Sequence, residues 1–172
     1  MQEKGWTRLL FAAFVFSGFG AVSADRASAQ AEPPLHIDIP VNLAKANVVF
    51  DVGHKVLWGD APFVLGDLHL LANDYRSGQT QGHIVAIFHG DAAYLVLNDE
   101  AYNTAQHVQT GNPYAEHLTG LMKQGVQIEL CGATAQANHW VNANLLHGVK
   151  VNTDAMVRVT ELEQQGYTLI YE

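Results

Sequence analysis

The stretch Val126-Gln127-Ile128-Glu129-Leu130-Cys131-Gly132-Ala133-Thr134-Ala135-Gln136-Ala137 joins an apolar run to a segment of small residues. Residues 126–130 are typical of a short β-strand, and residues 132–137 are typical of a tight turn that opens a helix. Cys131 lies at the junction, where unpaired backbone N–H groups and the positive end of a helix dipole favour a thiolate. The stretch therefore predicts a strand-to-helix unit that carries a candidate reactive cysteine.

Segments on both sides of this unit extend the same alternation of strand and helix. In chain order, the predicted segments are residues 46–52, 62–77, 83–89, 113–124, 126–131, 155–165 and 167–170. Strands that alternate with helices are typical of a parallel sheet in an α/β fold. The polar stretch from Asn98 to Asn112 is predicted to be a long loop. Ligands of such sheets bind outside the carboxyl ends of the strands, where Cys131 and the pair His89-Gly90 are expected.

Two of the predicted helices carry an apolar stripe. In the first, spacings of three and four residues align Val64, Leu68, Leu71 and Tyr75 on the face expected to cover the sheet. In the last, Met156, Val159 and Leu162 share one side, and Gly166 is suited to end the helix.

The N-terminus has the features of a secretory signal peptide. Lys4 and Arg8 precede an apolar stretch over residues 9–22, and Ala27-Ser28-Ala29 provides a cleavage pattern, with cleavage after Ala24 as the rival. The sequence therefore predicts a periplasmic or secreted protein that is not inserted in a membrane once the signal is removed.

Removal of residues 1–29 leaves 143 of the 172 residues, the usual size of one domain. The net charge of −8 becomes −9, which disfavours nucleic acid as a partner. Residues 30–45 contain three prolines and are predicted to form an arm that packs on a neighbouring subunit. The expected domain is residues 46–172.

Several familiar sites are missing from the sequence. Residues 51–55, after the first strand, lack a glycine-rich phosphate loop, and no Gly-x-Ser-x-Gly elbow occurs. The nine histidines, among them His83, His89, His139 and His147, lack the spacing of a dedicated zinc site. We therefore expect neither a cofactor nor a bound metal.

The order of the elements and four short motifs together resemble the DsrE/DsrF (YchN-like) family over residues 46–171. The motifs are His89-Gly90, Gly125-Val126, Cys131-Gly132-Ala133-Thr134-Ala135 and Gln164-Gln165-Gly166-Tyr167. The resemblance implies a single-domain three-layer sandwich with a mainly parallel sheet of about five strands. It also implies a homo-oligomer.

The family is associated with sulfur handling, and Cys131 and His89 match its strand-end cysteine and its His-Gly position. The resemblance implies a sulfur-relay or sulfurtransferase-like protein that holds a persulfide on Cys131. Its partners would be a small sulfur compound and an acceptor thiol protein. The well-understood relay members are cytoplasmic, whereas this chain carries an export signal, so the donor and acceptor would differ.

The remaining predicted site residues support this chemistry. His89 is expected to assist proton transfer, and Gly90, Gly132 and Thr134 are expected to line the binding site. Thr134 would cap the helix or donate a hydrogen bond to sulfur. The alternative is a non-catalytic binding or scaffold module with the same fold and an oligomeric surface, in which Cys131 is an unreactive buried residue.

Overall fold

The computed structural model describes residues 35–78 and 80–172. The predicted signal peptide and the first part of the predicted arm, residues 30–34, lie outside the described residues. The chain divides after Asp38, and the short described piece before this point exposes Leu35 and Ile37. None of the helices in the described part of the chain has the length and apolar character that a membrane-spanning helix needs.

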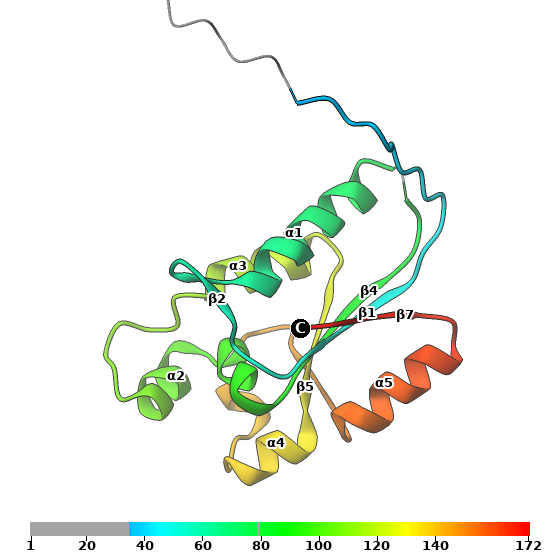
Figure 1. The fold of residues 1–172 in the computed structure, drawn as a ribbon. Coiled ribbons are helices and arrows are strands. Elements are labelled where there is room, and N and C mark those ends of the chain that lie inside the picture. The colour runs from blue at the N-terminus through cyan, green and yellow to red at the C-terminus, as the bar shows by residue number, and fades with distance from the viewer. Residues whose placement is uncertain (1–34, 79) are drawn as a thin grey trace, which may run out of the picture. The chain divides into compact units, whose positions relative to one another are not determined.

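Five parallel strands form the central sheet (Figure 1). They are β1 (Val48–Val52), β4 (Ile84–Phe88), β5 (Gln127–Cys131), β6 (Lys150–Asn152) and β7 (Thr168–Tyr171). Their spatial order is β6-β5-β4-β1-β7, so the neighbours of β1 are strands that come later in the chain. A short antiparallel hairpin, β2 (Leu57–Trp58) with β3 (Ala61–Pro62), lies outside this sheet.

Helices cover both faces of the sheet, as the sequence predicts. They are α1 (Phe63–Arg76), α2 (Asp99–Gln106), α3 (Ala115–Lys123), α4 (Gly132–Ala137) and α5 (Ala155–Gln164), with 3-10 turns at η1 (Gly90–Val96) and η2 (Asn142–Asn144). Helices α1 and α3 share one hydrophobic core with the sheet, whereas α5 builds a second core on the opposite face. The α/β sandwich with a five-stranded parallel sheet is thereby confirmed.

Alternating side chains of the central strands supply the two cores. In β1, Phe50 packs into the core beneath α1, whereas Val49 packs into the core beneath α5. Every residue of β1 and β4 is buried, which explains why both strands are almost continuously apolar in sequence. The stripe predicted on α1 faces this sheet, with Val64 and Leu68 buried.

The predicted long loop between Asn98 and Asn112 is wrong, because α2 lies within it. The side-chain oxygen of Asn98 accepts a hydrogen bond from the backbone N–H of Ala101 at 2.9 Å and so caps the helix. Asp99 and Glu100 follow in the first turn, where negative charge is favourable. A polar stretch with a cap residue and acidic first turn forms a helix despite its few apolar side chains.

The apolar side predicted for α5 is correct only in part. Val159 and Leu162 are buried, but Met156 is exposed, and Ala155 takes its place in the core. Asp154 caps the helix by accepting hydrogen bonds from the N–H groups of its first turn. The helix therefore presents its first residue, Ala155, to the sheet.

Gly132 allows the close turn from β5 into α4. A Cβ atom at this position would overlap the carbonyl oxygen of Asn152 and stand 3.0 Å from that of Thr153. Both obstacles are backbone atoms, which move less readily than the end of a side chain.

We expect Gly132→Ala to lower the free energy of unfolding by about 2 kcal/mol, because the new methyl group overpacks the turn. Gly66→Ala is the matched control, since nothing lies within 4 Å of its Cβ position in α1. That control should stabilise the protein by about 0.5 kcal/mol. Urea unfolding measures both variants, and equal effects of the two would contradict the packing argument.

Candidate functional site

Asp51, His89 and Cys131 lie at or near the carboxyl ends of three neighbouring strands. Asp51 lies near the end of β1, and Cys131 ends β5. The register pairs Phe88 of β4 with Leu130 of β5, so His89 and Cys131 are the next residues along their strands. Because adjacent parallel strands lie about 4.8 Å apart, the backbones of His89 and Cys131 are close neighbours.

The same three side chains share one face of the sheet. Val49, Ile87 and Cys131 all pack into the core beneath α5. Asp51 and His89 each follow one of these residues by two positions, and side chains of a strand alternate between faces. Asp51, His89 and Cys131 therefore form a row on the α5 face, which we call the edge site.

The thiol of Cys131 is held at the start of α5. Its Sγ accepts a hydrogen bond from the backbone N–H of Ala155 at 3.3 Å, and the residue is 4% exposed. The sequence predicted bonds from the N–H groups after Gly132, and this detail is wrong. Cys131 is the N-cap residue of α4, but its side chain makes no capping bond there. The positive end that faces sulfur belongs to the ten-residue α5.

His89 is fixed by a carboxylate that sequence analysis did not select. Its Nε2 lies 2.8 Å from Oδ1 of Asp51, and the two side chains are 22% and 6% exposed. Gly53 provides space for the ring, because a Cβ atom there would stand 2.9 Å from Cε1 of His89. Gly90 has a φ of 55° and approaches the carbonyl oxygen of Gly53 closely. The predicted residue Gly90 thus has a packing role at this edge.

A second histidine–aspartate pair also connects the segments at the ends of β1 and β4. Nδ1 of His54 lies 3.2 Å from Oδ1 of Asp91, and both side chains are exposed. In the inner pair the aspartate lies in β1 and the histidine follows β4. In the outer pair His54 follows β1 and Asp91 follows β4. The outer pair is longer and exposed and uses Nδ1, whereas the inner pair is shorter and largely buried and uses Nε2.

Of the two roles expected for Thr134, capping the helix is wrong. It is the third residue of α4 and is half-buried, because the N-cap position belongs to Cys131. A hydrogen bond from Thr134 to a sulfur ligand stays a prediction. Within residues 35–78 and 80–172, no three His, Cys, Asp or Glu side chains gather as a metal site.

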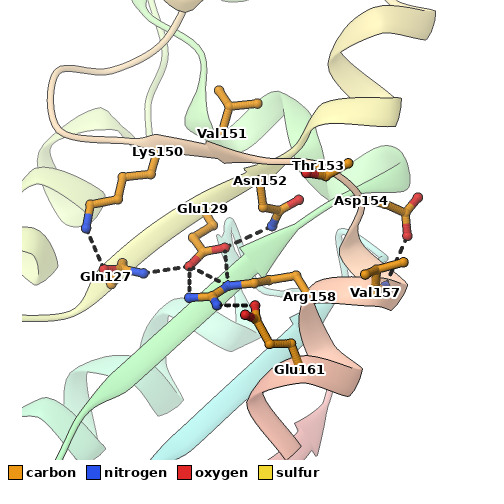
Figure 2. Close-up of a pocket in the computed structure, with 10 residues that line it drawn as sticks. All are labelled: Gln127, Glu129, Lys150, Val151, Asn152, Thr153, Asp154, Val157, Arg158 and Glu161. Carbon is orange, nitrogen blue, oxygen red and sulfur yellow. Dashed lines mark hydrogen bonds and ion pairs between the residues drawn. The ribbon is translucent and has the colours of Figure 1, made fainter. Parts of the chain in front are cut away.

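A buried ion pair next to the edge site joins α5 to the sheet (Figure 2). Glu129, two residues before Cys131 in β5, accepts hydrogen bonds from Nε and Nη2 of Arg158 at 3.0 to 3.2 Å. Asn152 and Gln127 donate to the same carboxylate at 2.9 and 2.6 Å. These residues line an open pocket of about 500 Å³ between β5, β6 and α5.

The electrostatics of this pair follow from burial and hydrogen bonding. Burial by itself would raise the pKa of Glu129, but hydrogen bonds from Arg158, Asn152 and Gln127 outweigh it and lower that pKa. The hydrogen bond to Glu129 in turn raises the pKa of Arg158. The pair therefore stays charged and holds α5, whose first N–H contacts Cys131, against β5.

Sequence analysis missed both Asp51 and Glu129, although each left a signal. Asp51 interrupts Val48-Val49-Phe50-Asp51-Val52, and Glu129 interrupts the apolar part of β5. A charged residue in a strand buried on both faces requires a partner, because an unpaired buried charge is costly. The identity of each partner depends on which elements become neighbours in space.

Comparison with known proteins identifies the family of this α/β domain. The model of the DsrE/DsrF-like family matches residues 59–171. The chain therefore belongs to the DsrE/DsrF-like family, as the motifs around His89 and Cys131 had suggested. None of the curated proteins matches the chain.

Two solved structures share the fold at low sequence identity. The protein of unknown function MTH1491 from Methanobacterium thermoautotrophicum is 19% identical with a TM-score of 0.58, and the match covers 74% of this chain and 99% of that one. The ychN protein from E. coli is 16% identical with a TM-score of 0.53, with coverage of 74% and 99%. At these identities the likeness supports the fold alone.

We expect Arg158→Met to lower the free energy of unfolding by about 3 kcal/mol at pH 7, because it leaves the carboxylate of Glu129 buried without its cation. The lowered pKa of Glu129 stabilises the fold above the carboxyl's ordinary value of 4.5, and this contribution is lost as the pH falls through the lowered pKa. The gap between the two proteins should therefore shrink in acid. Urea unfolding from pH 7 to about pH 3 measures it.

The control is Arg76→Met, because the guanidinium of Arg76 bonds only to the exposed Asn73 at 3.1 Å among the described residues. Its effect should stay below about 0.5 kcal/mol at every pH. A destabilisation by Arg158→Met that is the same at both ends of the pH range would contradict the proposed pairing with Glu129.

Proposed function

We propose that this protein is an exported sulfur carrier that holds sulfane sulfur on Cys131 as a persulfide. The observation that carries the proposal is the hydrogen bond from the first N–H of α5 to Sγ of Cys131. An N–H donor at the positive end of a helix stabilises an anionic sulfur, either a thiolate or a persulfide. The association of the DsrE/DsrF-like family with sulfur relay supports the same chemistry.

The proposed transfer has two substitution steps without net oxidation. The thiolate of Cys131 attacks the sulfane sulfur of a donor, the S–S bond of the donor breaks, and the rest leaves with its electron pair as a thiolate or sulfite. An acceptor thiolate then attacks the outer sulfur of the persulfide, and Cys131 leaves as a thiolate. His89 accepts the thiol proton of Cys131 before the first step.

Access to the thiol requires a local opening. Cys131 is buried, and the segment from Asn152 to Asp154, just before α5, lies against the β5–α4 turn at Gly132. We infer that this segment moves when a donor enters. Its backbone is anchored by the cap residue of α5 and by the Asn152 contact with Glu129, so opening would work against these bonds.

The burial of Cys131 also favours a second candidate function, a non-catalytic binding or scaffold module. In that case the thiol is a core residue that satisfies the first N–H of α5, and function would lie in a pocket or an oligomer surface. The two candidates differ in one property, the reactivity of Cys131 in the folded protein.

The proposal includes a homo-oligomer located in the periplasm or secreted. In residues 35–43 every second side chain is a large apolar one, and these side chains are exposed. They are Leu35, Ile37, Ile39, Val41 and Leu43. Apolar side chains in this pattern favour pairing with another chain.

We expect the chain without residues 1–29 to sediment as a stable oligomer at micromolar concentration. Replacement of Ile39 and Val41 by serine should weaken the assembly, because it removes apolar surface from the contact. Replacement of the exposed Leu70 of α1 by serine is the control. Sedimentation of the unaltered chain as a monomer would contradict the oligomer proposal.

Intact-mass spectrometry tests the carrier itself. We expect the folded protein to gain the mass of one or more sulfur atoms after exposure to polysulfide or thiosulfate, and the gain to be absent in Cys131→Ala. Cys131 is the only cysteine in the chain, so the variant is a complete control. A thiol that gains no sulfur and alkylates only after unfolding would refute the carrier and support the binding module.

A further inference from the structure

A second pocket lies on the opposite side of the sheet from the edge site. It has a volume of about 570 Å³ and is formed by η1, α2, the segment that follows α4, and η2. Since η1 follows β4 and α4 follows β5, these elements leave the carboxyl ends of two central strands, where open parallel sheets bind ligands. We call it the α2–α4 pocket. Its main lining side chains are Tyr94, Glu100, His107, Asn138, His139 and Trp140.

Two aromatic rings form one wall of the α2–α4 pocket. Tyr94 and Trp140 are half-buried and pack against the core beneath α1 and α3. Their ring centroids are 5.1 Å apart, and the ring planes meet at 80°. The hydroxyl of Tyr94 donates to Oδ1 of Asn138 at 3.5 Å, and Nδ2 of Asn138 donates to the carbonyl of Thr134 at 2.9 Å. The nearly perpendicular rings therefore bound a corner whose aromatic faces attract a cation.

The charge around this aromatic corner is negative. Glu100 lines the pocket and is exposed, and no basic side chain of the described residues lies within ion-pair distance of its carboxylate. Within the described part of the chain, no Lys or Arg lines the pocket. The helix α2 also ends here, at its C-cap His107, and the carbonyl end of a helix is partly negative. The pocket thus favours a positively charged ligand.

Two histidines of the pocket have an unusual backbone conformation. Among the described residues, His107 and His139 are the two non-glycine residues with a positive φ, at 56° and 57°. Glycine adopts this conformation at a lower steric cost, and residues held in it tend to cluster at ligand sites. A neutral imidazole has one nitrogen that accepts a hydrogen bond, which suits a ligand with N–H or O–H groups. Within residues 35–78 and 80–172 they form no metal site with Glu100.

We propose that the α2–α4 pocket binds a small organic ammonium ion. Its positive group lies against the rings of Tyr94 and Trp140 and pairs with the carboxylate of Glu100. His107 and His139 accept hydrogen bonds from the polar groups of the ligand. The rival ligand is an anion held by protonated histidines, which the free carboxylate and the lack of Lys and Arg in the pocket oppose. The proposal goes beyond the sulfur carrier and does not depend on it.

The experiment measures binding of choline and of 1,4-diaminobutane to the full chain by titration calorimetry. The neutral isostere of choline, 3,3-dimethyl-1-butanol, separates the effect of charge from that of shape, and acetate tests the anion. In a second protein, Trp6→Phe and Trp58→Phe leave Trp140 as the only tryptophan. Its fluorescence then reports whether the ligand lies at the aromatic corner.

We expect at least one of the two amines to bind saturably and to change the emission of Trp140, and the alcohol to bind at least about tenfold more weakly than choline if choline is the ligand. Glu100→Gln and Trp140→Leu should each weaken binding of the amine by about fivefold or more. The matched control is Glu116→Gln, because Glu116 is also an exposed glutamate in the first turn of a helix, α3, but lies outside the pocket. It should change the affinity by less than about twofold.

Three results would overturn the proposal. They are no saturable binding of either amine up to about 10 mM, equal loss of affinity in Glu100→Gln and Glu116→Gln, and binding of acetate in preference to the amines. Urea unfolding checks the fold of Trp140→Leu, and Glu100→Gln keeps the aromatic wall, so a misfolded tryptophan variant leaves the test intact.

The same titration in Cys131→Ala separates this proposal from the sulfur carrier. Cys131 does not line the α2–α4 pocket and packs into the core on the other side of the sheet, so the variant should bind the amine with unchanged affinity. Amine binding in a protein that takes up no sulfur would refute the carrier alone. Sulfur uptake by a protein that binds neither amine would refute the ammonium site alone.

Discussion

Parallel hydrogen bonding of β1, β4 and β5 is the constraint on which the rest of this structure depends. It brings the carboxyl ends of three strands, which are separated by long stretches of chain, to one edge of one sheet. Since the strands are buried on both faces, helices must cover each side, and alternation assigns every second side chain to the α5 face. Asp51, His89 and Cys131 become neighbours for this reason alone.

The same constraint couples the burial and hydrogen bonding of the thiol to the docking of α5. The N–H of Ala155 reaches Sγ of Cys131 only while α5 stays against β5, and the ion pair of Arg158 with Glu129 holds it there. Loosening of this contact would expose the thiol and remove its hydrogen-bond donor together. In the proposed carrier, burial and activation of Cys131 would therefore be opposing demands at one helix terminus.

Glycines make the close approaches at this edge possible. Gly53 leaves space for the ring of His89, Gly90 approaches the backbone of Gly53, and Gly132 lies against the carbonyl groups before α5. In the sequence, His89-Gly90 and Cys131-Gly132 were motifs of family resemblance. In the structure, each glycine has a steric reason, because a methyl group at any of the three positions would displace a neighbouring atom at this edge of the sheet.

The sequence by itself determined the type and order of most elements, and it placed Cys131 and His89 at strand ends, because periodicity and turn residues act over a few neighbouring positions. It did not reveal α2, whose caps and charges replace an apolar stripe, or the partners Asp51 and Arg158. The order β6-β5-β4-β1-β7 was decided by the tertiary structure alone. A hydrogen bond between distant residues depends on which strands become neighbours, and no local pattern records that choice.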